Sequence, residues 1–388
     1  MSGDGGPTPE PLRGPSFGSY AADDVGWLLT DLSGVVLEAP TAEREEAVQN
    51  GGAHYAESLP VEYRPDAAYL DLYRHALATA APRVAHAVGS VAEQVLARRG
   101  PDVVLASLAR AGTPVAILLR RWAAVMHGLD LPHYAVSIVR GRGIDRLALA
   151  HLAAHHDPAR VQFVDGWTGK GVIAGELAAA LRSYRVDTAV RFDPELAVLA
   201  DPGRCVTLFG TREDWLVPSA CLNSTVSGLV SRTVLNARLI GPGRYHGAKF
   251  YSDLAADDVS TAFVDTITER FPDVADRVRS EPNRPRPAPD DAGLNAVQQI
   301  VRVYDIGDVN LVKPGVGETI RVLLRRVPWK VLTRAGAPAA DLAPVRMLAA
   351  RRGVPVEEVE DLPYTCVGLI HPRFSRGATG ADGRAVGR

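Results

Sequence analysis

Short apolar runs alternate with longer amphipathic stretches in the first half of the 388-residue chain. Short apolar runs bounded by polar residues are typical of buried strands, and apolar positions at helical spacing are typical of helices. The pattern predicts three strand–helix pairs, with strands at 102–107, 134–139 and 160–164 and helices at 113–127, 144–156 and 171–183. Strands that alternate with helices predict an α/β fold with a doubly wound, mainly parallel sheet.

A proline-rich segment at 279–292 has the composition of a linker and divides the chain into two units, 16–278 and 293–373. In the second unit the same patterns predict a small α/β domain, with helices at 295–303 and 342–350 and strands at 319–324, 329–332, 353–356 and 367–370. Residues 1–15 and 374–388 are rich in glycine, proline and small polar residues, so we expect disordered tails there.

Composition argues against several classes of protein. The formal net charge of −2 argues against a protein that coats nucleic acid along its whole surface. The three cysteines are widely spaced, which provides neither a disulfide framework nor a CxxC metal site. The N-terminus lacks the features of a signal peptide, and no long uncharged apolar run could span a membrane. We therefore expect a soluble cytoplasmic protein with no membrane partner, and a homo-oligomer remains open.

The most informative motif joins the third predicted strand to its helix. The apolar run ends at Asp165, and a turn made of Gly166, Trp167, Thr168, Gly169, Lys170 and Gly171 leads into the helix. Backbone N–H groups at a helix N-terminus can hold a phosphate, while Asp165 can face a ribose hydroxyl or a Mg²⁺ ion. The spacing fits neither a Walker A loop nor a dinucleotide-binding fingerprint. The motif favours a phosphorylated ribose, and an ordinary strand–helix turn without a ligand is the alternative.

Two further loops are expected at the same edge of the sheet, because ligands of doubly wound sheets bind beyond the carboxyl ends of the strands. Both loops combine guanidinium groups, which suit phosphate oxygens, with glycines that allow close backbone approach. Their candidate residues are Arg110, Gly112 and Thr113 in one loop and Arg140, Arg142 and Asp145 in the other. An isolated arginine is usually a solvated surface residue. We expect these arginines to contact a ligand because their loops are predicted to meet the phosphate-type loop at one edge of the sheet.

Several segments spread over 17–373 give the chain a resemblance to a known family. They lie at 44–46, 52–57, 140–145, 164–171, 218–228, 246–251 and 313–319. The loops are similar to those of phosphoribosyltransferases. The longer motifs resemble the phosphoribosyltransferase-like, StiP-type proteins of bacterial tellurium-resistance and stress operons, in which a transferase-like domain precedes a Pelota-type RNA-binding domain with an L7Ae-like fold.

The resemblance implies a Mg²⁺-dependent phosphoribosyltransferase that uses phosphoribosyl pyrophosphate and an unidentified acceptor, in the synthesis of a nucleoside-like stress metabolite. Asp165 would approach the ribose or the metal, and Gly166 to Gly171 would hold the 5′-phosphate. Charge on the pyrophosphate would be met by Arg110, Gly112, Thr113, Arg140 and Arg142. The loop carries one acid where the family usually has two, and Asp145 can supply the second.

A second interpretation is a cysteine hydrolase, because some relatives carry the label cysteine protease. Cys221 stands in a polar segment that can open a helix, and a helix N-terminus lowers the pKa of a thiol. His246 would orient or deprotonate that thiol. The alternatives are a buried structural cysteine, or a pocket wall in which Asn223, Ser224 and Thr225 contact the base or acceptor.

A third interpretation is a non-catalytic protein that binds a nucleotide and carries RNA on its second unit. Lys313, Arg321, Arg325 and Arg326 provide cations beside glycine turns, and these groups can meet the phosphates of structured RNA. The alternatives for this basic strip are an exposed strand edge and an intramolecular contact with the first unit.

Overall fold

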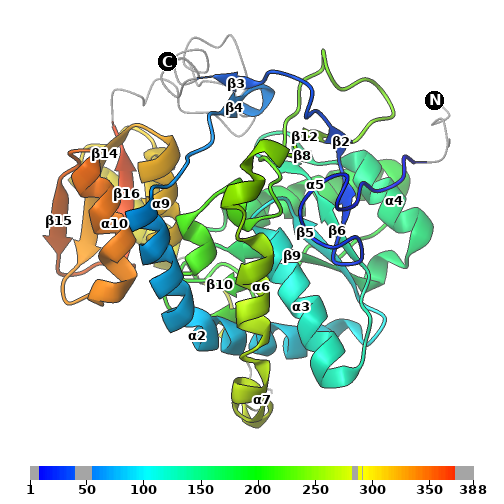
Figure 1. The fold of residues 1–388 in the computed structure, drawn as a ribbon, viewed down its shortest axis with the longest axis horizontal. Coiled ribbons are helices and arrows are strands. Elements are labelled where there is room, and N and C mark those ends of the chain that lie inside the picture. The colour runs from blue at the N-terminus through cyan, green and yellow to red at the C-terminus, as the bar shows by residue number, and fades with distance from the viewer. Residues whose placement is uncertain (1–7, 40–54, 282–286, 291, 372–388) are drawn as a thin grey trace.

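The computed structural model describes residues 8–39, 55–281, 287–290 and 292–371. A six-stranded sheet lies at the centre of the first domain, in the order β1-β6-β5-β9-β10-β11, and every neighbouring pair runs parallel (Figure 1). Its strands are β1 (Gly26–Leu28), β5 (Val104–Leu108), β6 (His133–Val136), β9 (Val161–Trp167), β10 (Leu196–Ala200) and β11 (Leu208–Thr211). The predicted α/β architecture with a mainly parallel sheet is confirmed, together with a small C-terminal domain.

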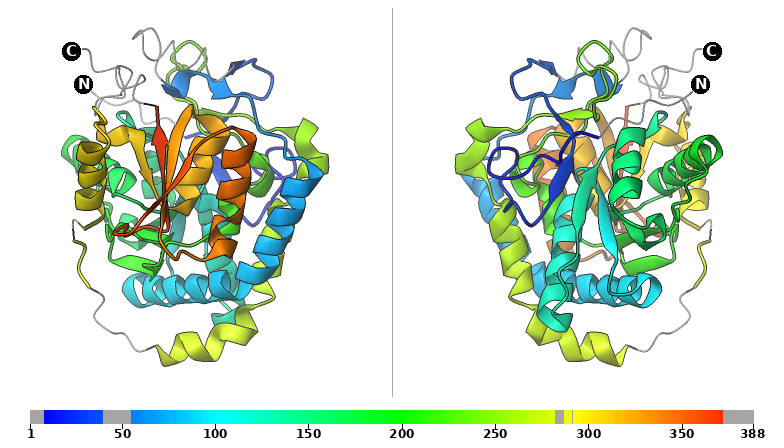
Figure 2. Two further views of the ribbon diagram at one scale, coloured as in Figure 1. Left: turned by 90° about the vertical axis from the view of Figure 1, so that its left-hand side faces the viewer. Right: turned by 90° about the vertical axis from the view of Figure 1, so that its right-hand side faces the viewer.

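Helices cover both faces of this sheet and create two hydrophobic cores. One side carries α2 (Ala67–Arg99), α3 (Gly112–His127), α6 (Ser260–Thr268) and α7 (Phe271–Ser280), and the other carries α4 (Arg146–His155) and α5 (Val172–Thr188). Side chains alternate along the strands: Leu105 belongs to the core of α2 and α3, and Ala106 to the core of α4 and α5. The side views in Figure 2 show α2 running from the C-terminal domain to the underside of the sheet.

Short elements connect the larger ones. The strands β2 (Thr30–Asp31) and β12 (Gly247–Ala248) pair, as do β3 (Glu38–Ala39) with β4 (Leu59–Pro60), and β7 (Ile138–Val139) with β8 (Gly143–Ile144). Single helical turns are η1 (Tyr55–Glu57), η2 (Pro158–Arg160), η3 (Pro218–Cys221), η4 (Ser224–Val226), η5 (Ser252–Asp257) and η6 (Val309–Leu311).

The C-terminal domain is built on a four-stranded mixed sheet in the order β13-β16-β14-β15. Its elements are α8 (Ala292–Val303), β13 (Val312–Pro314), α9 (Val316–Arg325), β14 (Pro328–Arg334), α10 (Ala339–Arg351), β15 (Val356–Val359) and β16 (Cys366–Ile370). α8 packs on one face of the sheet with its own small core. α9 and α10 cover the other face, and their apolar residues join the main core of the first domain. The two domains therefore share a hydrophobic interface.

The predicted strand at 319–324 is wrong, because these residues belong to helix α9. Thr319, Ile320 and Leu323 are buried at helical spacing, which places them on one face of α9 against β16 and α10. The predicted strands and helices of the first domain between 102 and 183 are confirmed, with shifts of a few residues at their ends.

The N-terminal tail is shorter than predicted. Leu12 pairs with Trp27 through two backbone hydrogen bonds, so residues 8–15 pack against the first domain. Within the predicted linker, Asp290 forms an ion pair with Arg204 at 3.0 Å. The rest of the predicted tails, 1–7 and 374–388, lies outside the described residues. The same holds for the motif at 44–46, for residues 52–54 of the next motif, and for residues 282–286 and 291 of the linker.

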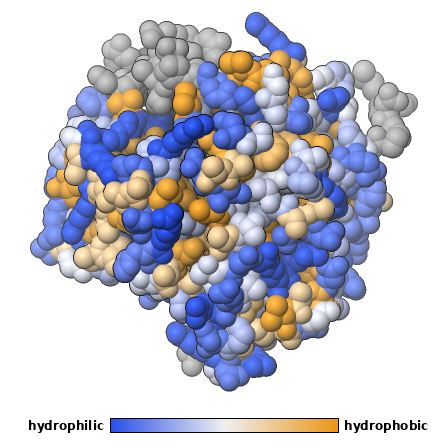
Figure 3. All heavy atoms as spheres, viewed as in Figure 1, coloured by the Kyte–Doolittle hydropathy of each residue, from blue (hydrophilic) through white to orange (hydrophobic). Residues whose placement is uncertain are grey.

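Hydrophobic side chains on the face shown in Figure 3 are scattered among hydrophilic ones. Among the described residues, none of the helices is both long enough and apolar enough to cross a membrane.

Candidate active site between the two domains

The carboxyl ends of β5 and β9 are brought into backbone contact by two glycines. A Cβ atom on Gly112 would lie 2.3 Å from the carbonyl oxygen of Val164, and one on Gly166 would lie 3.2 Å from that of Ala111. Any side chain at Gly112 would therefore push the two loops apart. This contact explains why the loop after β5 and the loop after β9 lie together at one edge of the sheet.

A pocket of about 220 Å³ opens beside the loop that follows β9, and we call it the interdomain pocket. Both domains contribute to its wall. The first domain supplies Arg140, Asp165, Trp167, Thr168, Gly169, Lys170, Gly171, Val172, Ile173 and Leu196, and the second supplies Lys313, Pro314, Glu318 and Arg321. Six of the predicted site residues in the first domain thus line one pocket: Arg140, Asp165, Thr168, Gly169, Lys170 and Gly171.

Most cations of the pocket already have protein partners. The Lys170 ammonium donates hydrogen bonds to the carbonyl oxygens of Val309 at 2.7 Å and Val312 at 2.9 Å, and burial lowers its pKa. The Arg140 guanidinium donates to the side chain of Asn310. These two residues therefore attach the second domain to the first. Arg142, in contrast, is exposed and does not line the pocket.

Two acids and an arginine also line the pocket. Burial raises the pKa of Asp165 to about 6, although its carboxylate accepts the N–H of Gly166 at 2.7 Å. Arg321 forms an ion pair with Glu318 at 2.7 Å and stacks over the ring of Trp167 at 4.4 Å. Among the described residues no group of three or more metal-binding side chains is present. Glu318 is already paired with Arg321, and burial disfavours the charged form of Asp165, so these two acids do not fit a Mg²⁺ ion.

The loop after β5 uses its side chains for packing. Arg110 pairs with Glu62 at 3.3 Å and donates to the carbonyl oxygen of Val230 at 3.0 Å. Thr113 is fully buried and accepts a hydrogen bond from Ser107 at 3.4 Å. Both residues are therefore engaged inside the protein, close to the crevice and outside the lining of the interdomain pocket.

Asp145 caps a helix. Its side chain accepts the N–H groups of Leu147 and Ala148 at the start of α4, and also the N–H of His246 at 2.6 Å. With its oxygens used in this way and only 3% of its surface exposed, Asp145 does not supply the second acid of a ligand site.

Cys221 and His246 are not paired. Cys221 is fully buried in the main core, where burial raises the pKa of its thiol to about 12 and Tyr69 donates to its carbonyl oxygen at 3.0 Å. The ring of His246 instead shares a hydrogen bond with Ser137 at 2.8 Å. Cys221 lies in a helical turn, as its sequence context suggested, but its burial in the core makes the thiol unreactive.

Asn223, Ser224 and Thr225 are also buried. Their backbone carbonyl groups accept hydrogen bonds from Ser227, Leu229 and Val259, which shapes the turn after η3. None of the three lines the interdomain pocket. These three residues therefore belong to the buried interior, where the Oγ of Ser224 has no hydrogen-bond partner among the described residues.

A cysteine that the sequence did not bring to notice lies next to the pocket. Cys205 is half-buried, and its side chain hydrogen bonds to Thr168. Its Sγ would lie 3.3 Å from a Cβ on Gly171, which has φ 75° and begins helix α5. Burial, and then the charge of Asp201, raises the pKa of this thiol to about 12. No sequence motif marks Cys205, since it is brought to the loop after β9 by the turn that follows β10.

The predicted RNA-binding residues face the first domain. Lys313 and Arg321 line the interdomain pocket, and burial lowers the pKa of Lys313 to about 8. The Nε of Arg325 is buried without a hydrogen-bond partner among the described residues, and the Nε of Arg326 is also buried. The basic strip at 313–326 is thus part of an intramolecular contact.

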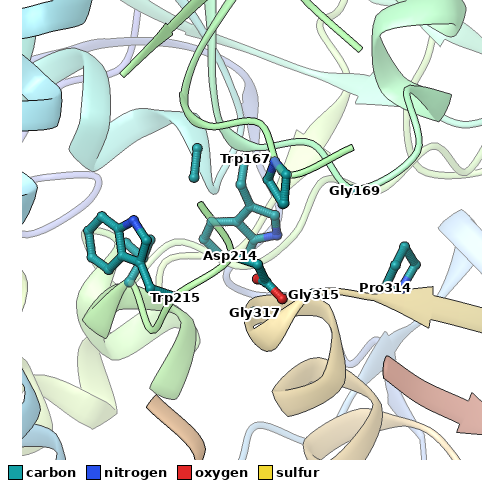
Figure 4. Close-up of a pocket in the computed structure, with 10 residues that line it drawn as sticks. Trp167, Gly169, Asp214, Trp215, Pro314, Gly315 and Gly317 are labelled. Carbon is teal, nitrogen blue, oxygen red and sulfur yellow. The ribbon is translucent and has the colours of Figure 1, made fainter. Parts of the chain in front are cut away.

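A second cavity at the domain interface is too small for a ligand. Figure 4 shows Trp167, Asp214 and Trp215 of the first domain around it, with Pro314 and Gly315 approaching from the second. Its volume of about 10 Å³ corresponds to roughly one water molecule. This region anchors the domains, because the Asp214 carboxylate accepts the N–H of Val316 at 3.0 Å.

Comparison with known proteins gives the family. Residues 18–268 match the family described as "Tellurite-like stress resistance cysteine protease StiP", and residues 291–372 match the PELOTA RNA binding domain. The chain is 34% identical over 368 residues to the protein named cysteine protease StiP from Acinetobacter baylyi, covering 91% of this chain and 94% of that protein. The chain belongs to the StiP family. The StiP part of the predicted resemblance is confirmed.

These findings correct the predicted activity. The family and the relative are named as cysteine proteases, so the prediction of a phosphoribosyltransferase that uses phosphoribosyl pyrophosphate is wrong. A strand–turn–helix motif predicts the local backbone conformation. It does not predict the reaction, because proteins with unrelated activities share this backbone. The second interpretation, a cysteine hydrolase, is the one that the comparisons favour.

Proposed function

We propose that this StiP chain is a cysteine-dependent peptidase in which Cys205 is the nucleophile. The observation that carries the proposal is the position of Cys205 against Thr168 and Gly171, at the edge of the interdomain pocket. Cys221 and Cys366 are both fully buried, so Cys205 is the thiol that a substrate reaches most easily. The names of the family and of the relative support the same class of enzyme.

The surroundings of Cys205 fit acyl transfer to a thiol. Attack of Sγ on a peptide carbonyl carbon forms a tetrahedral oxyanion, and the N-terminus of α5 at Gly171 provides partial positive charge beside it. The amine then leaves with a proton, and water hydrolyses the thioester. A proton acceptor is required, because the resting thiol is protonated. The leaving amine itself accepts this proton, because the Asp201 carboxylate is fully buried, accepts the N–H groups of Cys205 and Val206, and pairs with Arg212 at 3.3 Å.

Hydrolysis of a casein-derived peptide mixture by wild type and single cysteine variants tests this proposal. Cys205→Ala should abolish cleavage, and Cys221→Ala should retain it once each variant is shown to be folded by circular dichroism. Retained cleavage in Cys205→Ala would overturn the assignment of the nucleophile. Absence of cleavage by the wild type would overturn the peptidase.

We also propose that the C-terminal domain binds structured RNA, because it matches the PELOTA RNA binding domain. Since the strip at 313–326 faces the first domain, the contact would use exposed arginines such as Arg346 on α10. Fluorescence polarisation with a hairpin RNA should show salt-dependent binding that Arg346→Ala weakens and Lys313→Met does not. The opposite pattern would contradict this surface.

A further inference from the structure

The interdomain pocket carries more positive than negative groups. Its wall holds four basic side chains and two acidic ones: Arg140, Lys170, Lys313 and Arg321 against Asp165 and Glu318. Three of the basic groups have partners, as described above, in the carbonyl oxygens of Val309 and Val312, the side chain of Asn310, and Glu318. The neutral partners of Lys170 and Arg140 leave their charges in place, so the net charge of the pocket wall is positive.

Lys313 is the basic group without a partner. Its ammonium forms no hydrogen bond or ion pair among the described residues. The charges of Glu318 and Asp308 nevertheless raise its pKa and so favour its charged form. A partly buried ammonium that has lost water and forms no hydrogen bond or ion pair is unfavourable. An anionic group that enters the pocket would supply that counter-charge, so the pocket is complementary to a negative ligand.

A second feature supports an anion at the same place. Gly171, Val172 and Ile173 line the pocket at the N-terminus of α5, a helix of 17 residues. The N–H groups of a first helical turn have no partners inside the helix and favour negative charge. Lys313 from the second domain and the α5 N-terminus from the first thus face the same space.

We propose that the interdomain pocket binds the acidic side chain of a peptide substrate, so that the enzyme prefers to cleave next to Asp or Glu. This inference rests on the proposed function, because Cys205 lies against Thr168 and Gly171, which also line the pocket. A side chain held by Lys313 would place its own backbone near the thiol.

The size of the pocket favours a single acidic side chain over RNA. A volume of about 220 Å³ accepts one side chain and its neighbouring atoms, whereas an RNA strand carries repeated charges along its length. One carboxylate also balances one unpaired ammonium.

Calorimetric titration with two matched peptides tests the binding directly. The protein is the full chain carrying Cys205→Ala, which binds but does not cleave, and the peptides are acetyl-Ala-Glu-Ala-amide and acetyl-Ala-Gln-Ala-amide. The Glu peptide should bind at least about tenfold more tightly, because a charge-assisted hydrogen bond to Lys313 is lost with Gln. Adding Lys313→Met should remove the preference, and adding Arg279→Met, at an exposed arginine on α7, should leave it unchanged.

The outcomes separate this inference from the proposed function. Equal affinity for the two peptides overturns the acidic-side-chain site, and that comparison needs no substitution in the pocket. Inorganic phosphate or a hairpin RNA that displaces the Glu peptide more strongly than free glutamate also overturns it. A Glu preference that disappears in the Lys313→Met variant supports the site. If wild type then cleaves neither peptide, the peptidase fails and the acid-binding pocket stands.

Discussion

The carboxylate of Asp214 accepts the backbone N–H of Val316 at 3.0 Å, and its other oxygen accepts the N–H of Thr365 at 2.7 Å. Asp214 belongs to the first domain, and the two amides begin helix α9 and precede strand β16 in the second. Burial raises the pKa of Asp214 to about 6, which shows that these bonds form in a poorly hydrated contact. One side chain thus holds two elements of the C-terminal domain beside the interdomain pocket.

Replacing Asp214 by Ala should destabilise the contact between the domains. Two buried N–H groups lose their acceptor, and each unsatisfied group costs about 1–3 kcal/mol. We expect a loss of about 2–4 kcal/mol in the free energy of unfolding measured by urea denaturation. Asp276→Ala, at a carboxylate that is 99% exposed, should change stability by less than about 0.5 kcal/mol. Equal effects of the two substitutions would contradict the anchoring role.

Binding of the Glu peptide should depend on pH in two steps. Burial raises the pKa of Asp165 to about 6, so this group is neutral below pH 6 and adds negative charge to the pocket above it. Burial lowers the pKa of Lys313 to about 8, so the ammonium loses its charge above pH 8. Affinity measured by calorimetry should therefore fall as pH rises through 6 and again through 8. Asp165→Asn should remove the first fall, and a fall at pH 6 that persists in this variant would contradict the assignment.

Alkylation by iodoacetamide should distinguish the three cysteines in the native protein. The pKa of Cys205 is raised to about 12, first by burial and then by Asp201, so the thiolate forms only as pH rises far above 8. At pH 8 Cys205 should react about 10³-fold more slowly than a free thiol, yet before Cys221 and Cys366, which are fully buried. Mass spectrometry after tryptic digestion identifies the site. Labelling of Cys221 ahead of Cys205 would contradict the burial of Cys221.

Two glycines near the crevice should respond oppositely to alanine. A Cβ on Gly112 would meet the carbonyl oxygen of Val164 at 2.3 Å, and separating these loops should cost about 2–3 kcal/mol. Gly175, inside helix α5, has no atom within 4 Å of such a Cβ, so Gly175→Ala should stabilise the protein by about 0.5–1 kcal/mol. Thermal denaturation of the two variants measures both effects. Stabilisation by both substitutions would show that the loops separate without strain.

The sequence predicted the parallel sheet because the strand–helix alternation between 102 and 183 is local. It did not predict α2, whose 33 residues contain Pro82 and lack a narrow apolar stripe, since α2 is buried along several sides. The prediction of a strand at 319–324 was wrong because β-branched residues such as Ile320 also occur in helices when tertiary packing buries one face of the helix.

The candidate site was predictable only in part. Asp165, Thr168 and Lys170 follow one another in a recognisable turn, so their common position in the pocket could be expected. Cys205 could not be found in the same way, because it reaches the pocket through a contact between segments that are distant in the chain. Lys313 was expected on an RNA-binding surface, and its position in the pocket depends on how the two domains pack. Cys221 attracted attention through its polar neighbours, but these residues are buried with it and do not line the pocket.

Covalent trapping with a peptide chloromethyl ketone that carries Glu beside the reactive carbon tests the central claim most directly. The acidic side chain should enter the interdomain pocket and bring the reagent to Cys205, and the matched Gln reagent should react about tenfold more slowly. The account predicts a single adduct on Cys205, located by mass spectrometry of tryptic peptides. An adduct on Cys221, or no adduct with a folded protein, would contradict it.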